Sequence, residues 1–244
     1  MLFNMSLTIT LSGHGSQLSS TFYPPIQLQE GRYRIALLRL SVYNSIPNVT
    51  KDNNCLEVNI LSKPHKIAVP VGTYEIEEIS EAIGEQIKLK SNLADDAKDL
   101  FHIEANTNTL QTNIFSKFPV SFNVNNSIAP LIGILKNTNI PEKGRITSEK
   151  IADINPVDVI RVECNIATGS FLNGQSSHTI YEFNPNVPSG YKITEVPKNL
   201  IYLPLVNTQS ISDVTIKFVD QNQKLVNFRG ERSSVVLAIE KYGA

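Results

Sequence analysis

The chain has 244 residues, of which 41% are hydrophobic and 18% are charged, and its formal net charge is −1. The near-zero charge excludes a broad basic field for nucleic acid, so we predict no specific nucleic-acid partner, and the ordinary apolar content excludes an acidic, disordered chain. The length suits one large β domain or two smaller ones, and the abundance of Asn, Ser, Thr and Ile favours strands over helices.

The first residues, the apolar runs and the cysteines indicate the cellular compartment of the protein. The first residues have no positively charged region followed by a sustained apolar run, so we predict a protein made inside the host cell without a signal peptide. No segment reaches the roughly 18 apolar residues that a membrane span needs. Cys55 and Cys164 both lie in alternating apolar runs and are interpreted as small buried side chains rather than a disulfide.

The N-terminal third predicts strands. Residues 6–11 alternate apolar and polar side chains, which gives a strand one buried face. Residues 13–16 contain two glycines but lack the flanking residues of a phosphate loop or a nucleophile elbow, so a flexible turn is expected. Residues 33–43 are apolar nearly throughout and predict a central strand. Shorter strands are expected at 56–61 and 67–71.

An amphipathic helix is predicted from about residue 75 to 90. Its apolar stripe consists of Ile76, Ile79, Ile83 and Ile87, and acidic residues precede basic ones along it, as the helix dipole favours. Further strands are expected at 101–105, 109–115 and 120–124. Residues 127–134 are apolar and predict a short helical turn that plugs the core.

The C-terminal part returns to strand patterns after a polar segment at 136–156, which we interpret as a linker or surface excursion. Residues 157–166 and 178–183 predict strands. Residues 211–242 alternate in two sets around a hairpin turn at 220–224 and predict a three-stranded meander. Residues 33–43 and 157–166 are expected to supply the opposing sheet or the strands beside this meander.

These patterns together predict a mainly β chain: an antiparallel β-sandwich with one amphipathic helix and a short helical plug. Three parts are expected: an N-terminal β-rich half with the helix (1–135), the linker or excursion (136–156), and C-terminal strands that complete the sandwich (157–244). The two halves form either a single domain or two closely packed subdomains.

No catalytic, cofactor-binding or metal-binding residues can be assigned, and we predict that the protein is not an enzyme. The four histidines, His14, His65, His102 and His178, are scattered and have no Cys or His partner at ligand spacing. No Ser, Cys or Thr lies in a recognisable nucleophile motif.

Charged residues around two glycines are the candidate contact sites. Arg229, Glu231 and Arg232 surround Gly230, and Arg32 follows Gly31. One interpretation is a solvated loop with a local ion pair of little energetic value. The other is an inter-subunit contact, because arginine is enriched at protein interfaces.

Five stretches carry a family resemblance through their order and spacing: YPPIQLQEGRYRIALLRLSVYNSIPNV at 23–49, IAVPVGTYEIEEISEAI at 67–83, SIAPLIGI at 127–134, VIRVECNI at 159–166 and ISDVTIKFVDQNQKLVNFRGE at 211–231. Together they resemble the minor capsid (penton-type) proteins of Polinton/Maverick elements and adintovirus-like viruses. Ile134 departs from the pattern, because such relatives often have an aromatic residue after the glycine of the plug.

The resemblance implies a jelly-roll sandwich that forms the vertices of an icosahedral capsid, as a homopentamer beside a major capsid protein of the double jelly-roll type. It implies a virion location and no cofactor. A closed ring needs two different patches that meet between neighbours, and the N-terminal arm (1–30) and residues 136–156 are the candidates for these patches.

Two other classes of function remain open. One is another β-sandwich of the virion, such as a major-capsid-like or receptor-binding module. The other is a carbohydrate-binding or hydrolytic β-sandwich, for which the chain offers no tryptophan to stack on sugars.

Overall fold

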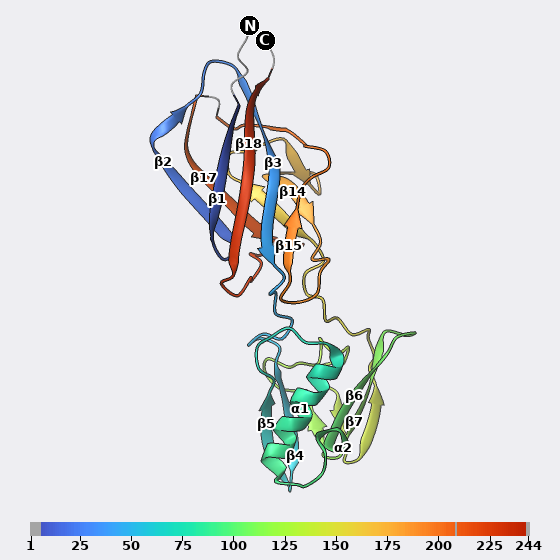
Figure 1. The fold of residues 1–244 in the computed structure, drawn as a ribbon. Helices are drawn as coiled ribbons and strands as arrows, with labels where there is room; N and C mark the ends of the chain where they lie inside the picture. The colour runs from blue at the N-terminus through green and yellow to red at the C-terminus, as the bar shows by residue number, and fades with distance from the viewer. Residues whose placement is uncertain (1–5, 208, 243–244) are drawn as a thin grey trace. The chain divides into compact units, whose positions relative to one another are not determined.

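The computed structural model describes residues 6–207 and 209–242 (Figure 1). Contacts divide the chain into two compact units: a sandwich unit, made of Met1–Ile46 and Val157–Ala244, and an inserted unit, Pro47–Pro156. This division differs from the predicted one. The boundary before Val157 coincides, but the other boundary lies at Ile46, and residues 136–156 belong to the inserted unit.

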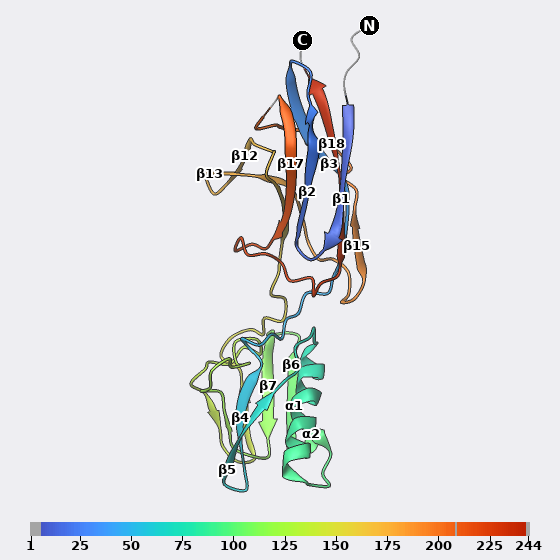
Figure 2. The same ribbon diagram turned by 90° about the vertical axis from the view of Figure 1, so that its left-hand side faces the viewer.

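Two antiparallel sheets and a small hairpin form the sandwich unit (Figures 1 and 2). Sheet I has the order β1 (Ser6–His14), β18 (Arg232–Tyr242), β3 (Arg32–Tyr43), β15 (Lys192–Glu195), with β16 (Leu203–Pro204) also on β3. Sheet II has the order β14 (Thr179–Phe183), β11 (Ile160–Cys164), β17 (Ser210–Val219), β2 (Gln17–Gln27). The hairpin consists of β12 (Ser170–Leu172) and β13 (Gln175–Ser177).

The strand order is that of a jelly roll. If the eight main sandwich strands are numbered along the chain, sheet I reads 1-8-3-6 and sheet II reads 5-4-7-2. Strands that follow one another in sequence therefore mostly lie in opposite sheets, as two Greek keys require. The predicted fold class is confirmed, and the inserted unit enters between the third and fourth of these strands.

The core of the sandwich unit lies between the two sheets. Sheet I contributes the buried side chains Ile9, Leu37, Val235 and Leu237, and sheet II contributes residues such as Val162, Val214, Ile216 and Phe218. These are the apolar members of the alternating runs, because successive side chains of a strand point to opposite faces.

The meander predicted for residues 211–242 is wrong, although its turn is correct. β17 and β18 lie in opposite sheets. The turn forms as expected, since the Asp220 amide donates to the Lys224 carbonyl at 2.8 Å. The next residues cross from sheet II to sheet I and bury Val226 and Phe228 on the way. As predicted, β3 lies beside β18 and β11 lies beside β17.

Two further sheets and two helices form the inserted unit. One sheet, sheet III, has the order β5 (Lys63–Ala68), β4 (Cys55–Ile60), β8 (Val120–Ser121), β9 (Asn139–Ile140). The other, sheet IV, has the order β10 (Gly144–Thr147), β7 (Gln111–Ser116), β6 (Phe101–Asn106). The helices are α1 (Ile76–Ser91) and α2 (Ala97–Leu100).

Helix α1 forms where the sequence predicts it, and its isoleucine stripe is fully buried. Glu75 and Glu78 form a capping box that satisfies backbone amides of the first turn. The helix lies along β6, and the Ser80 hydroxyl accepts a hydrogen bond from the Ile103 amide at 2.9 Å. No helix of the described residues is long and apolar enough to cross a membrane.

The predicted plug and the predicted excursion both contribute to the inserted unit. Residues 127–134 form consecutive turns rather than a regular helix, and they bury Ile128, Ile132 and Ile134. Residues 136–156 supply β9 and β10 and bury Ile140, which is 1% exposed. This segment is polar because its strands are short and have few buried positions. It is a structured part of the inserted unit and not a free linker.

Candidate interaction surfaces

A tight turn at residues 228–231 closes one end of the sandwich unit. Phe228 is 1% exposed and meets Phe218 edge to face, with ring centroids 5.5 Å apart. Its carbonyl accepts hydrogen bonds from the Ser45 hydroxyl at 2.7 Å and from the Glu231 amide at 2.9 Å. The buried ring and these bonds fix the backbone, while the side chain of Arg229 remains exposed.

The same turn is bonded to the connection between β1 and β2. The Gly15 amide donates to the Glu231 carbonyl at 3.0 Å, and the Ser233 hydroxyl donates to the Gly15 carbonyl at 2.9 Å. His14 Nδ1 lies 2.9 Å from the Gly230 carbonyl oxygen. Residues 13–16 therefore form the predicted turn, but it is anchored by hydrogen bonds at several points.

Three of the four predicted contact residues come together at this corner. Arg229, Glu231 and Arg232 are all exposed there. Arg32 is exposed too, but it pairs with Tyr242 at the far end of β18. No ion pair among the described residues includes any of the four, so the interpretation as a local ion pair has no support in the geometry.

The far end of β18 has its own cluster around Arg34. The Arg34 Nε donates to Glu240 Oε1 at 2.7 Å, and the guanidinium lies over the Tyr202 ring at 4.3 Å and the Tyr242 ring at 5.4 Å. Partial burial and the hydrogen bond to Glu240 raise the pKa of Tyr202. Arg34 therefore has a carboxylate partner within the chain, whereas no ion pair is described for Arg229 or Arg232.

Arg232 also lines a groove of about 330 Å³ on the outer face of sheet I. The strand register places a row of four hydroxyl side chains across the sheet. They are Ser12 on β1, Ser234 on β18, Ser41 on β3 and Thr194 on β15. Such side chains both donate and accept hydrogen bonds, so the row can meet either kind of partner atom.

Three cations flank this hydroxyl row. Arg39 lies on one side of it, and Arg232 and Lys192 lie on the other. The Lys192 ammonium is 6.0 Å from the centroid of the Tyr43 ring, and the only hydrogen bond described for Arg232 is a long one, 3.5 Å, to the Ser12 hydroxyl. None of the three joins a described ion pair, so this is a cationic patch without an internal counter-ion.

Sequence reasoning identified Arg232 but missed Arg39 and Lys192. These residues come from strands distant in the chain, and no local motif marks them. One feature of the sequence could have indicated Arg39. It is a charged residue in the middle of a mostly apolar strand, and such a residue must point away from the core.

The two segments predicted to form the contact patches of a ring, 1–30 and 136–156, are integrated into the fold as far as they are described. Within residues 1–30, β1 is hydrogen-bonded along its length to β18, and β2 is the edge strand of sheet II. Residues 1–5 lie outside the described residues. In the segment 136–156, the Ser148 hydroxyl accepts from the Thr112 amide at 3.0 Å and donates to the Lys150 carbonyl at 2.6 Å.

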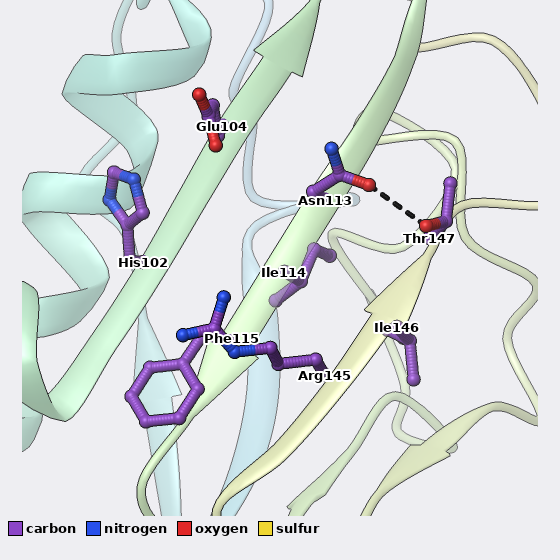
Figure 3. Close-up of a pocket in the computed structure, with 8 residues that line it drawn as sticks. All are labelled: His102, Glu104, Asn113, Ile114, Phe115, Arg145, Ile146 and Thr147. Carbon is purple, nitrogen blue, oxygen red and sulfur yellow. Dashed lines mark hydrogen bonds between the residues drawn. The ribbon is translucent and has the colours of Figure 1, made fainter.

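A second groove, of about 320 Å³, lies on sheet IV of the inserted unit (Figure 3). One row across the three strands contains His102, Phe115 and Arg145, and the next contains Glu104, Asn113 and Thr147. The Arg145 guanidinium lies 5.2 Å from the centroid of the Phe115 ring. The Thr147 hydroxyl donates to Asn113 Oδ1 at 2.8 Å.

In residues 6–207 and 209–242, no group of three His, Cys, Asp or Glu side chains is placed to hold a metal ion. Every buried side-chain nitrogen and oxygen in that part of the chain has a hydrogen-bond partner.

The two units define a class of fold: a jelly roll with an α/β unit inserted between its third and fourth strands. The solved structure of mavirus penton protein has a similar fold. The superposition covers 98% of this chain and 100% of that one, with a TM-score of 0.52 and 11% sequence identity. No protein-family model and no curated protein sequence matches the chain. The chain therefore has a penton-like fold.

Proposed function

We propose that this protein is a penton-type minor capsid protein that forms the vertices of an icosahedral capsid. The observation that supports it is the extent of the fold similarity. Both the jelly roll and the inserted unit are within the superposition, which spans nearly all of this chain and all of the mavirus penton protein. A jelly roll alone occurs in many proteins with unrelated functions.

The proposal extends to the assembly and its origin. The protein forms a homopentamer in the virion, in contact with a major capsid protein of the double jelly-roll type, and it comes from a Polinton/Maverick or adintovirus-like element. The stretches quoted from the sequence support this origin. Its function lies in its surfaces, and it is not an enzyme.

The proposal also names the residues that make contacts in the ring. Each subunit of a ring presents two different patches to its two neighbours. We assign the exposed corner with Arg229, Glu231 and Arg232 to one of them, together with the cationic groove on sheet I. Arginines without a described carboxylate partner suit a contact with carboxylates or carbonyls of a neighbour. Arg32 belongs to a separate region at the far end of β18.

Mass photometry of the purified chain tests the proposal. A pentamer of this 27.1 kDa chain has a mass of about 136 kDa, as a five-fold ring requires. A trimer of about 81 kDa would favour a major-capsid-like or receptor-binding module. A chain that stays monomeric over a concentration series, and does not join capsids when co-expressed with the major capsid protein, would contradict a vertex role.

A further inference from the structure

The groove on sheet IV presents a set of complementary polar groups on a rigid support (Figure 3). Ile103 and Ile114 on β6 and β7 are buried, so the alternate residues of these strands point out into the groove. The Ser80 hydroxyl of α1 binds the Ile103 amide, and the Thr112 and Ser148 backbones bond to each other at 2.8 Å. These bonds hold the backbone of the sheet, so the points from which the groove side chains project are fixed.

One end of the groove carries a cation whose hydrogen-bond donors are free. The Arg145 guanidinium lies over the Phe115 ring, which holds its plane in position. No described hydrogen bond or ion pair engages the side chain of Arg145, or that of His102, which pairs with the other side of Phe115 in the sheet. A guanidinium in this situation is suited to bind a carboxylate through two parallel hydrogen bonds.

The other row supplies both donors and acceptors. The Thr147 hydroxyl donates to Asn113 Oδ1, which fixes the amide and turns its NH₂ group toward other partners. Glu104 lies opposite Asn113 in the strand register and makes no described hydrogen bond. An ionised carboxylate only accepts hydrogen bonds, so Glu104 selects a ligand that has hydroxyl or N–H donors.

We propose that this groove binds an acidic monosaccharide unit, such as a uronic or sialic acid at the end of a glycan. The sugar carboxylate meets Arg145, its hydroxyls meet Glu104 and Asn113, and its C–H groups pack on Phe115. The volume of about 320 Å³ lies at the small end of the range for ligand pockets, roughly 300 to 1,000 Å³, and suits a single ring.

The same groups discriminate against other ligands. A neutral sugar leaves the Arg145 guanidinium without a counter-ion, and an acidic peptide places a second carboxylate beside Glu104, where like charges repel. A site built to hydrogen-bond hydroxyl groups rejects a ligand that lacks them, because its polar groups then stay unpaired. This inference does not depend on the capsid role, because it concerns the surface of the inserted unit alone.

Saturation-transfer NMR with the full chain tests the proposal. The probes are methyl β-glucuronide and the methyl glycoside of N-acetylneuraminic acid; methyl β-glucoside is the matched neutral ligand, and acetyl-triglutamate amide is the acidic peptide. We expect an acidic sugar to bind with a dissociation constant on the order of 1 mM, and the glucoside and the peptide to bind at least tenfold more weakly.

Variants locate the binding. Arg145→Gln lowers the affinity for the acidic sugar at least tenfold, Arg145→Lys lowers it less, and Glu104→Gln lowers it severalfold. Lys66→Gln, which removes an exposed cation from β5 of the same unit, leaves the affinity unchanged. All variants keep the circular dichroism spectrum of the parent. No saturation transfer to either acidic sugar, equal transfer to the glucoside, tighter binding of the peptide, or full binding by Arg145→Gln would each overturn the proposal.

Discussion

Asn48 and Tyr74 are joined by two hydrogen bonds, from Asn48 Nδ2 to the Tyr74 carbonyl at 2.7 Å and from the Tyr74 amide to Asn48 Oδ1 at 3.0 Å. Asn48 Nδ2 also donates to the Ile154 carbonyl at 3.0 Å. One side chain, 3% exposed, thus ties the segment that enters the inserted unit to the start of α1 and to the segment that leaves it.

Replacing Asn48 tests how much this side chain stabilises the inserted unit. Asn48→Ala leaves three part-buried backbone groups of residues 74 and 154 without their partner, so we expect the unit to lose about 3 kcal/mol of unfolding free energy. Hydrogen exchange of amides in residues 47–156 measures the effect. Asn125→Ala, at an exposed asparagine in the same unit, is the control and should change little. Equal exchange rates in the two variants would contradict the expectation.

The aromatic pair under the 228–231 turn gives a second prediction. Phe228→Ala removes a buried ring from the contact with Phe218, and substitutions of this kind lower stability by about 3 to 5 kcal/mol. Phe228→Leu retains most of the apolar volume and should lower it by less than half as much. Urea denaturation followed by circular dichroism measures both. A destabilisation below about 1 kcal/mol for Phe228→Ala would show that the ring does not anchor the turn.

Alanine substitutions at two glycines with similar φ angles distinguish backbone strain from steric crowding of the added Cβ. Gly133 in the plug has φ +76°, and Gly174 in the β12–β13 hairpin has φ +80°. A Cβ at Gly133 would lie 2.3 Å from the Lys150 carbonyl oxygen, whereas a Cβ at Gly174 meets nothing within 4 Å. Both Ala variants bear the left-handed strain of roughly 1 kcal/mol. Gly133→Ala should therefore destabilise the protein clearly more than Gly174→Ala in thermal melts, and similar melting temperatures would refute the crowding.

Charge reversal at the 228–231 corner tests the assigned contact. Arg229→Glu and Arg232→Glu alter exposed side chains, so the melting temperature should stay within a few degrees of the parent. We expect each to reduce the pentamer fraction in mass photometry, because a charge that faces a neighbour changes from attraction to repulsion. Arg32→Glu, at the far end of β18, is the comparison and should reduce it less. Unchanged assembly in both corner variants would remove this corner from the interface.

Cys164 makes the unfolding free energy depend on pH in the alkaline range. Both cysteines are buried and free, as predicted, and burial raises the pKa of the Cys164 thiol from 9.0 to about 11. Below pH 9 the thiol is protonated in the folded and the unfolded chain. Between pH 9 and 11 the unfolded chain loses this proton first, so the stabilisation, up to about 2.7 kcal/mol, declines as pH rises. Cys164→Ala should show a shallower loss of melting temperature from pH 8.5 to 10.5, and the same slope as the parent would contradict this.

Periodicity in the sequence was enough to predict individual elements. Alternation located β1, β3 and β18, and the isoleucine stripe located α1 to within one residue at each end. These signals are local, because burial of one face acts on neighbouring positions of the same element. The jelly roll itself came from the family resemblance, since alternation does not say which strands pair.

The pairing partners required information that local patterns lack. β1 pairs with β18, more than two hundred residues away, and adjacent strands β17 and β18 lie in opposite sheets. The boundary at Ile46 was missed because it lies in an ordinary connection without a change in composition. The polar composition of residues 136–156 did mark the boundary before Val157, but it was interpreted as a linker or surface excursion. The set of contact residues predicted from the sequence was incomplete because Arg39 and Lys192 are distant from Arg232 in the chain. Only the pairing of strands in sheet I brings the three side chains to one groove.

The position of β18 has a consequence for synthesis of the chain. This strand lies between β1 and β3, so sheet I has no continuous hydrogen bonding until residues 232–242 have left the ribosome. The inserted unit is one continuous segment, Pro47–Pro156, and can complete its contacts while the later strands are still being translated. Closure of the jelly roll therefore comes after the inserted unit and must wait until β18 has been translated.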